Sequence, residues 1–171
     1  TYNGKFAHVT LADRTFYKDG NWNTIYLPFD MTLDEVAASP LADGDVRTLS
    51  NNITDEGDKV TLNFTEEGEA LTTWGGNMFS GGVPYIVKWA SGSDIVNPEF
   101  ANVTITNNKY YVGDNTKVVF EGTYAPMTYE AENKSILFIG EGNKLNWHLA
   151  GANTGAFRGY FELIGMYAEY N

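Results

Sequence analysis

The sequence predicts an all-β fold, in which two antiparallel sheets pack as a jelly-roll-like β-sandwich with one short helix near residues 32–39. Three observations support this prediction. Eighteen glycines interrupt a chain of 171 residues, short apolar segments alternate with polar residues, and one segment has a helical pattern. Since each strand presents an apolar face that needs a covering layer, we expect residues 1–171 to form a single sandwich module excised from a larger protein.

The strand that organises this prediction is Gly81–Trp89, where two glycines and a proline precede a run of large apolar side chains. Side chains alternate along a strand, so Tyr85, Val87 and Trp89 share one face. A face this rich in large side chains needs a second sheet to cover it. We therefore expect Val87 to be almost fully buried.

Two other segments alternate clearly between apolar and polar residues. Val60–Thr65 is the clearest half-buried strand, and Asn51–Thr54 is expected to pair with it across the turn at residues 55–58. Thr24–Phe29 alternates in the same way. Pro28 cannot donate a ladder hydrogen bond, which favours an edge or a strand end there.

The segment Ser135–Ile139 is apolar on both faces, as is typical of a central strand, and we expect Phe138 to be almost fully buried. Phe64, Phe120 and Phe161 are also expected inside. The remaining strands are predicted at Lys5–Thr10, Thr15–Tyr17, Val46–Leu49, Val103–Thr106, Lys109–Val112, Lys117–Tyr124 and Arg158–Ile164.

The single predicted helix covers Thr32–Ser39. Thr32 and Glu35 have the spacing of a capping box, and Pro40 ends the segment after about two turns.

The acidic composition limits the kinds of molecule that the protein can bind. Twenty-two acidic residues against eleven basic ones give a net charge of -11, which would repel nucleic acid and anionic membranes. No apolar run approaches the ~20 residues of a membrane span. The chain has no cysteine and hence no disulfide, thiol nucleophile or thiolate metal site. We expect neutral or cationic partners, and neither nucleic acid nor membrane insertion.

Few residues point to catalysis. Paired carboxylates such as Glu66–Glu67 and Glu130–Glu132 would suit a small glycosidase, but in so acidic a chain most carboxylates are solvated surface. His8 and His148 are far apart and have no metal-binding spacing. No nucleophile elbow or phosphate-binding glycine loop occurs. The prediction is therefore a protein that is not an enzyme.

We expect no cofactor, and calcium is the one metal that the sequence suggests as an alternative. Asp43, Asp45, Asp55 and Asp58 concentrate oxygen ligands in two predicted turns. Neither segment matches the twelve-residue calcium loop, and Asp and Gly favour turns for backbone reasons alone. We expect no metal site.

The aromatic residues carry most of the functional information, because they make up 15% of the chain. Trp22, Trp74 and Trp147 lie beside Gly or Asn in predicted turns. An exposed indole flanked by amide groups suits the apolar C–H face and hydroxyl rim of a sugar. The alternative is that each folds back as a lid on the core, which is the favoured interpretation for Trp22.

From these residues we predict a ligand-binding site. Trp74 and Trp147 would stack on sugar rings, with Trp89 as a third platform. The polar rim would be supplied by amide side chains that can both donate and accept, namely Asn77, Asn143 and Asn146.

Six phrases in order along the chain resemble a domain that recurs in secreted and cell-surface multidomain proteins of gut and rumen Bacteroidota. They are Leu11–Thr24, Tyr26–Asp30, Pro84–Trp89, Val96–Phe100, Glu121–Pro126 and Phe157–Phe161. The resemblance implies an extracellular or cell-surface location beside other domains of a parent chain. It implies no activity. Trp74 and Trp147 depart from the usual pattern of that group.

Three functions follow as hypotheses. The first is a non-catalytic carbohydrate-binding accessory module for a near-neutral plant polysaccharide or oligosaccharide, since uronic-acid-rich polymers would meet like charge. The second is a structural or adhesion spacer domain of a bacterial surface protein. The third is a small glycoside hydrolase.

Overall fold

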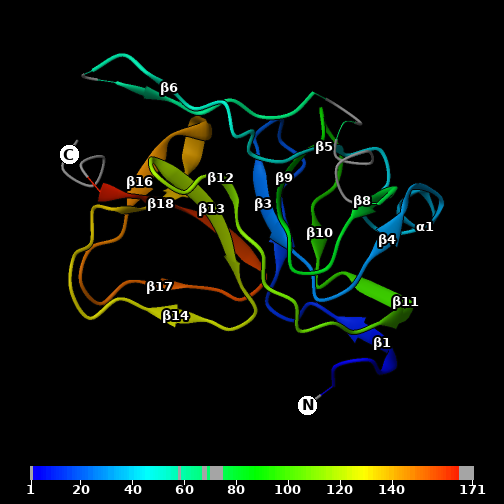
Figure 1. Cartoon of the computed structure of the whole chain (residues 1–171). Helices are drawn as coiled ribbons and strands as arrows, with labels where there is room; N and C mark the ends of the chain where they lie inside the picture. Colours follow the sequence, from blue (N-terminus) through cyan, green and yellow to red (C-terminus); the bar gives the residue numbers. More distant parts are fainter. Residues whose placement is uncertain (1, 58, 67–68, 70–74, 166–171) are drawn as a thin grey trace.

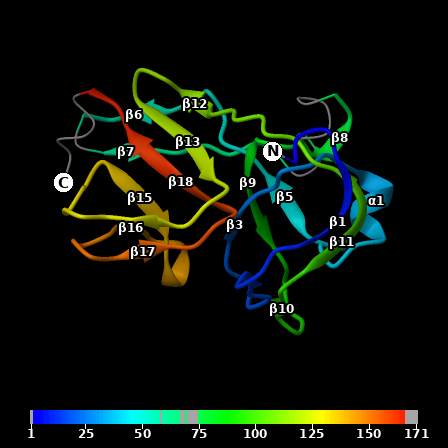
Figure 2. The ribbon, with the colours of Figure 1, turned by 90° about the horizontal axis from the view of Figure 1, so that it is seen from below.

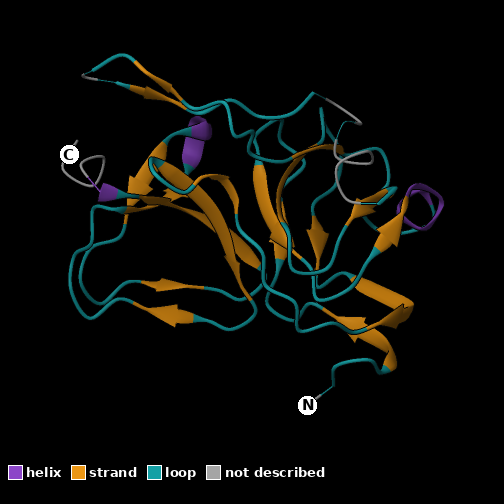
Figure 3. Ribbon diagram, viewed as in Figure 1, coloured by secondary structure: helices purple, strands orange, loops and turns teal. Residues whose placement is uncertain are grey.

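The computed structural model describes residues 2–57, 59–66, 69 and 75–165, and it is nearly all β (Figure 3). The predicted class is confirmed: several antiparallel sheets and one short α-helix are consistent with a β-sandwich. No helix among these described residues is long and apolar enough to cross a bilayer.

The strands are short, and Figure 1 shows their arrangement. Their bounds are β1 (Phe6–Thr10), β2 (Thr15–Phe16), β3 (Asn23–Tyr26), β4 (Met31–Thr32), β5 (Asp45–Arg47), β6 (Thr54–Asp55), β7 (Val60–Thr61), β8 (Asn77–Phe79), β9 (Pro84–Lys88), β10 (Ile95–Val96), β11 (Glu99–Thr104), β12 (Val112–Asp114), β13 (Val118–Thr123), β14 (Met127–Thr128), β15 (Ile136–Ile139), β16 (Leu145–Trp147), β17 (Asn153–Thr154) and β18 (Arg158–Leu163).

The larger sheet has the strand order β12-β13-β18-β15-β16, and all its pairs are antiparallel. One register row runs across it from β12 to β16 through residues that face the same side, which are Val112, Phe120, Phe161, Leu137 and Trp147. Phe120 and Phe161 stack with ring centroids 4.4 Å apart. This side is the inner face of the larger sheet.

The smaller sheet has the order β3-β9-β5, so the strand predicted to organise the fold lies at its centre. Both faces of β9 are covered. On one face Trp89 packs against Phe16 and Tyr85 against Phe79, and on the other Ile86 faces the larger sheet beside Phe161. Val87 is fully buried, as predicted.

The two sheets face each other, and Figure 2 shows β18 and β13 beside β3. They are in tight contact at Gly122, where an added Cβ would collide with the ring of Tyr26. Tyr26 is itself buried and packs on Tyr124. Glycine at position 122 therefore allows the sheets to approach, and their facing residues belong to one hydrophobic cluster.

The helix α1 (Leu33–Ala37) forms where the sequence predicts it. Thr32 Oγ1 accepts a hydrogen bond from the backbone N–H of Glu35, and the Glu35 carboxylate accepts one from the N–H of Thr32. This capping box satisfies two N-terminal donors, and Val36 fixes the helix to the core.

Three expectations need correction. Phe138 is only half-buried, because its outward ring is covered by the side chains of Tyr129, His148 and Tyr160 rather than by a sheet. Phe64 is half-buried too, and the regular part of its segment is limited to β7 and one isolated bridge to Leu49.

The third correction concerns strand bounds. The strand predicted at Val103–Thr106 begins earlier, at Glu99, and the one predicted at Lys109–Val112 begins only at Val112. Trp147, which the sequence predicts in a turn, lies in the strand β16, because β15 offers it a partner that local sequence does not reveal.

Candidate functional site

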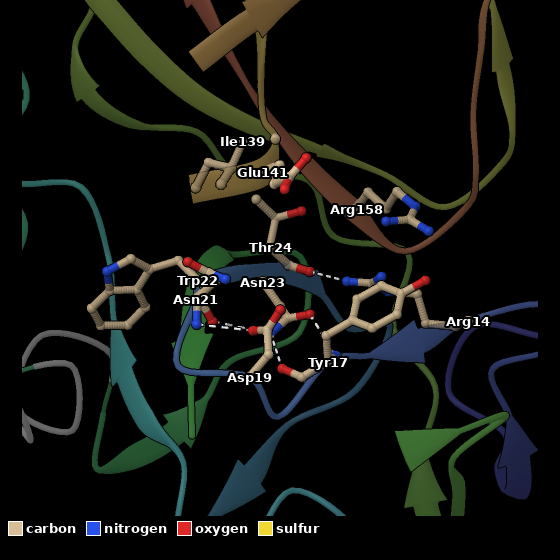
Figure 4. Close-up of a pocket in the computed structure, with 11 residues that line it drawn as sticks. Arg14, Tyr17, Asp19, Asn21, Trp22, Asn23, Thr24, Ile139, Glu141 and Arg158 are labelled. Carbon is tan, nitrogen blue, oxygen red and sulfur yellow. Dashed lines mark hydrogen bonds between the residues drawn. The ribbon is translucent and has the colours of Figure 1, made fainter. Parts of the chain in front are cut away.

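Away from Gly122 the two sheets diverge, and two cavities lie between them with Trp22 in the wall of both. The larger, the apolar cavity, has a volume of about 520 Å³ and is lined by residues of both sheets and of the β7 segment, including Leu62, Ile86, Leu145 and Phe161. The smaller, the arginine cavity, has a volume of about 350 Å³ and is bordered by Arg14, Tyr17, Thr24 and Arg158 (Figure 4).

The inner face of the larger sheet continues from the apolar cavity to an exposed edge. Leu145 pairs with Ile139, and both line the cavity. Trp147 is two residues further along β16 and therefore faces the same side as Leu145. Trp147 is 38% exposed, and the Lys134 ammonium lies 5.1 Å from the centre of its ring. Trp147 thus shares the inner face of the larger sheet with Leu145, which lines the apolar cavity beside Trp22; we call the apolar cavity and this adjoining face the groove.

Trp22 is held in place by polar and cationic groups. Its backbone N–H donates to Asn143 Oδ1 at 2.7 Å, which connects the smaller sheet to η1 (Glu141–Asn143) of the larger. The Lys88 ammonium lies 4.4 Å from its ring centre and the Arg47 guanidinium 5.6 Å. Trp22 is half-buried and packs against the core, which agrees in part with the prediction that it folds back over the core.

The arginine cavity is more polar. Figure 4 shows the Tyr17 ring beside the Arg14 guanidinium, with Arg158 and Glu141 above them. Burial, and then the charge of Arg158, lower the pKa of Arg14 to about 9. Burial also lowers the pKa of Arg158, whereas the Tyr17 phenol acts in the opposite direction.

The structure brings together part of the predicted site. Asn143 lines the apolar cavity beside Trp22, and Trp147 lies at the exposed end of the same surface. Asn146 does not join them, because alternation along β16 points it to the other face, where its amide donates to the Lys144 carbonyl. The rim around Trp147 is therefore less rich in amides than predicted.

Two other predicted residues lie elsewhere, and one lies outside the described residues. Trp89 is 3% exposed, and its indole N–H donates to the Ala42 carbonyl at 2.8 Å. Its use as a third stacking platform is therefore wrong. Asn77 begins β8, on the opposite side of the molecule from β16 (Figures 1 and 2). Trp74 is outside the described part of the chain.

Two of the four candidate calcium ligands have other partners. Asp45 forms an ion pair with Arg47 at 3.0 Å, and the Asp55 carboxylate accepts the backbone N–H of Gly57 within its own turn. Asp58 lies outside the described residues. The described residues include no group of three or more His, Cys, Asp or Glu side chains able to hold a metal ion.

The two histidines contact other side chains and lie in different parts of the fold. His8 lies 3.3 Å from the Glu99 carboxylate on the exposed β1-β11 ribbon. His148 stacks on Phe138 and lies 2.8 Å from Thr154 Oγ1. Both rings therefore have side-chain partners in the described structure.

One carboxylate pair lies on the outer face of the larger sheet. Tyr160 Oη donates to Glu121 at 3.2 Å, and Glu162 follows two residues later on the same side. Burial, and then the neighbouring Glu121, raise the pKa of Glu162. The pair faces away from the groove, so it does not supply carboxylates across that site.

Sequence reasoning missed both arginines of the arginine cavity. Arg14 and Arg158 are 144 residues apart, and the local sequence around each gives no sign of the other. Only the pairing of β13 with β18, and the packing of β18 on β3, bring them together.

No protein-family model, curated protein or solved structure matches this chain.

Proposed function

We propose that the protein is a non-catalytic carbohydrate-binding module that holds a polysaccharide or oligosaccharide in the groove. The observation that supports the proposal is that Trp22 lines the apolar cavity, while Trp147 lies partly exposed on the same sheet face as the cavity-lining Leu145. Indole rings suit the C–H faces of pyranose sugars, and the groups around them can bind hydroxyls. The pattern of an apolar lining with few polar groups is typical of small-molecule sites.

The polar groups at the apolar cavity fit the same ligand class. Asn143, Arg47 and Lys59 border it, and each offers donors to a neutral hydroxyl rim. Its volume of about 520 Å³ falls within the usual range for ligand sites. Two stacked rings contribute about 0.5–1.5 kcal/mol each beyond their buried area, so we expect dissociation constants from roughly micromolar to millimolar.

The net charge of -11 favours a near-neutral polysaccharide over one with an acid on every sugar. The resemblance to the Bacteroidota domain supports an extracellular or cell-surface location, in company with other domains. Both statements are part of the proposal.

Affinity electrophoresis against soluble neutral plant polysaccharides tests the proposal. We expect retardation on at least one of them, and several-fold weaker retardation for Trp22→Ala and for Trp147→Ala. Tyr2→Ala is the matched control, because Tyr2 is 78% exposed and lies outside the groove. Its retardation should equal that of the wild type, and the Tm of each variant shows whether the fold is intact.

Other outcomes select the rival functions. Absence of retardation on every glycan would favour the structural or adhesion spacer. Release of reducing sugar from the same panel at high protein concentration would favour the glycoside hydrolase.

A further inference from the structure

The Arg14 side chain is buried to a degree that is unusual for arginine, with 2% of its surface exposed. Its guanidinium donates to the carbonyls of Thr15, at 2.9 Å, and Thr24, and it lies 4.1 Å above the Phe16 ring. Its Nε–H has no hydrogen-bond partner among the described residues, although Arg14 lines the arginine cavity. A buried donor of a cation therefore remains unsatisfied within the cavity wall.

Arg158 adds a second cation to the same cavity. It begins β18, is half-buried, and is close enough to Arg14 to lower the pKa of that residue. Within the described part of the chain, neither arginine forms an ion pair with a carboxylate. Burying cations without a directly paired carboxylate is costly, so this arrangement favours an anion from outside.

Two carboxylates, those of Asp19 and Glu141, also border the cavity, but neither forms an ion pair with Arg14 or Arg158. The Asp19 carboxylate accepts a hydrogen bond from the backbone N–H of Asn21 at 2.9 Å. Glu141 is exposed on the opposite lip, in η1. Tyr17 is 53% exposed, its ring lies beside the Arg14 guanidinium in Figure 4, and its hydroxyl can donate to an oxyanion.

We infer that the arginine cavity binds the carboxylate of an acidic sugar residue, held by Arg14 and Arg158 while the sugar ring lies toward Trp22. The inference rests on the proposed function and names a substituent of its ligand. Arginine suits a carboxylate because its planar fork offers parallel donors. A single carboxylate on a mostly neutral glycan is compatible with the protein's net charge of -11. The two arginines attract it at short range, whereas salt screens its repulsion by distant surface carboxylates.

The test compares two monosaccharides that differ only at C6, methyl glucuronide and methyl glucoside. Each is titrated into the intact protein while the ¹H–¹⁵N signals of the tryptophan indoles and the arginine Nε groups are followed. We expect the glucuronide to bind about tenfold more tightly, because charge-assisted hydrogen bonds are roughly twice as strong as neutral ones. The Trp22 indole and the Arg14 and Arg158 Nε signals should shift.

Arg158→Gln should remove this tenfold preference, and Tyr17→Phe should reduce it several-fold. Lys5→Gln is the control: it changes the net charge equally at an exposed position before β1, and the preference should remain. If Arg158→Gln does not fold, Tyr17→Phe carries the test, because it removes one exposed hydroxyl.

Several results would overturn the inference. They are equal binding of the two sugars to the wild type, an unchanged preference in Arg158→Gln, and displacement of the glucuronide by an equal concentration of inorganic sulfate. Retardation on neutral glycans without a glucuronide preference would overturn the inference alone. Loss of all glycan retardation would overturn the proposed function as well.

Discussion

The two ends of the space between the sheets contrast sharply. At the packed end, Tyr26 touches Gly122, and Phe120 has no exposed surface; its ring stacks at an angle of 9° on Phe161, whose other side borders the apolar cavity. At the open end, Leu145 and Trp147 face the same side of the same sheet but are more than a third exposed. One register row thus runs from core to surface.

The contrast shows how a sandwich can separate stability from binding. Large apolar side chains at the packed end are covered by the opposite sheet, so their burial stabilises the fold. The same kinds of side chain at the open end lack that cover, and the cavities there leave apolar surface available to a ligand. Mutations at the two ends should therefore differ in what they change.

The largest expected effect is at the packed end. Phe120→Ala removes a fully buried ring from its stack with Phe161 and should lower the free energy of unfolding by about 3–5 kcal/mol. Leu145→Ala, at the open end, should change it by less than about 0.5 kcal/mol. Urea unfolding followed by tryptophan fluorescence measures both. Similar losses in the two variants would remove the distinction between the ends.

Gly122→Ala should have the next largest effect. The added methyl group would meet the Tyr26 ring, which cannot move freely because Tyr124 packs on it with ring centroids 4.5 Å apart. We expect a loss of about 1–3 kcal/mol, from the strain of overpacking. A thermal melt of the variant within error of the wild type would show that the sheets can separate there at little cost.

A smaller effect involves Glu162, on the outer face of the larger sheet. Its pKa is raised above the ordinary value of 4.5 by burial and by Glu121, so the folded state holds its proton more tightly than the unfolded state. Stability from this group is present at low pH and is lost as pH rises through the folded pKa.

Glu162→Gln should remove that pH dependence. We expect the Tm of the variant to rise relative to the wild type as pH increases from about 4 to about 7. A difference in Tm that stays constant over this range would contradict the assigned environment of Glu162.

Chelation should have the smallest effect. With Asp45 paired to Arg47, and Asp55 bonded within its turn, EDTA should leave the Tm within error. A calcium ion at a hundred times its dissociation constant would instead contribute ~2.7 kcal/mol. A drop in Tm that calcium reverses would show that these loops hold a metal.

Local patterns in the sequence predicted much of the fold. The capping box of α1 and the burial of Val87 follow from neighbouring residues, and the structure has both. The same alternation placed Trp89 on the face of Val87, which already favoured burial over its use as a stacking platform. Phe138 was misjudged because sequence shows that a strand is apolar on both faces but not what covers each face.

The candidate site was less accessible from sequence, because it depends on pairings between distant segments. The edge position of Trp147 requires β15 as a partner, and the position of Trp22 requires Asn143, 121 residues away. Arg14 and Arg158 meet only after the two sheets pack. No local propensity encodes such contacts, so Trp147 and Asn143 were predicted as site residues without their relation to Trp22.

The most direct test of the central claim, that the open end binds a glycan, uses the indole N–H signals as internal reporters. An oligosaccharide of a polysaccharide that retards the protein would be titrated into ¹⁵N-labelled protein. Trp22 and Trp147, in the groove, should shift progressively, whereas Trp89, whose indole is bonded to Ala42 in the core, should not. Saturable binding that leaves both Trp22 and Trp147 unshifted would contradict the account.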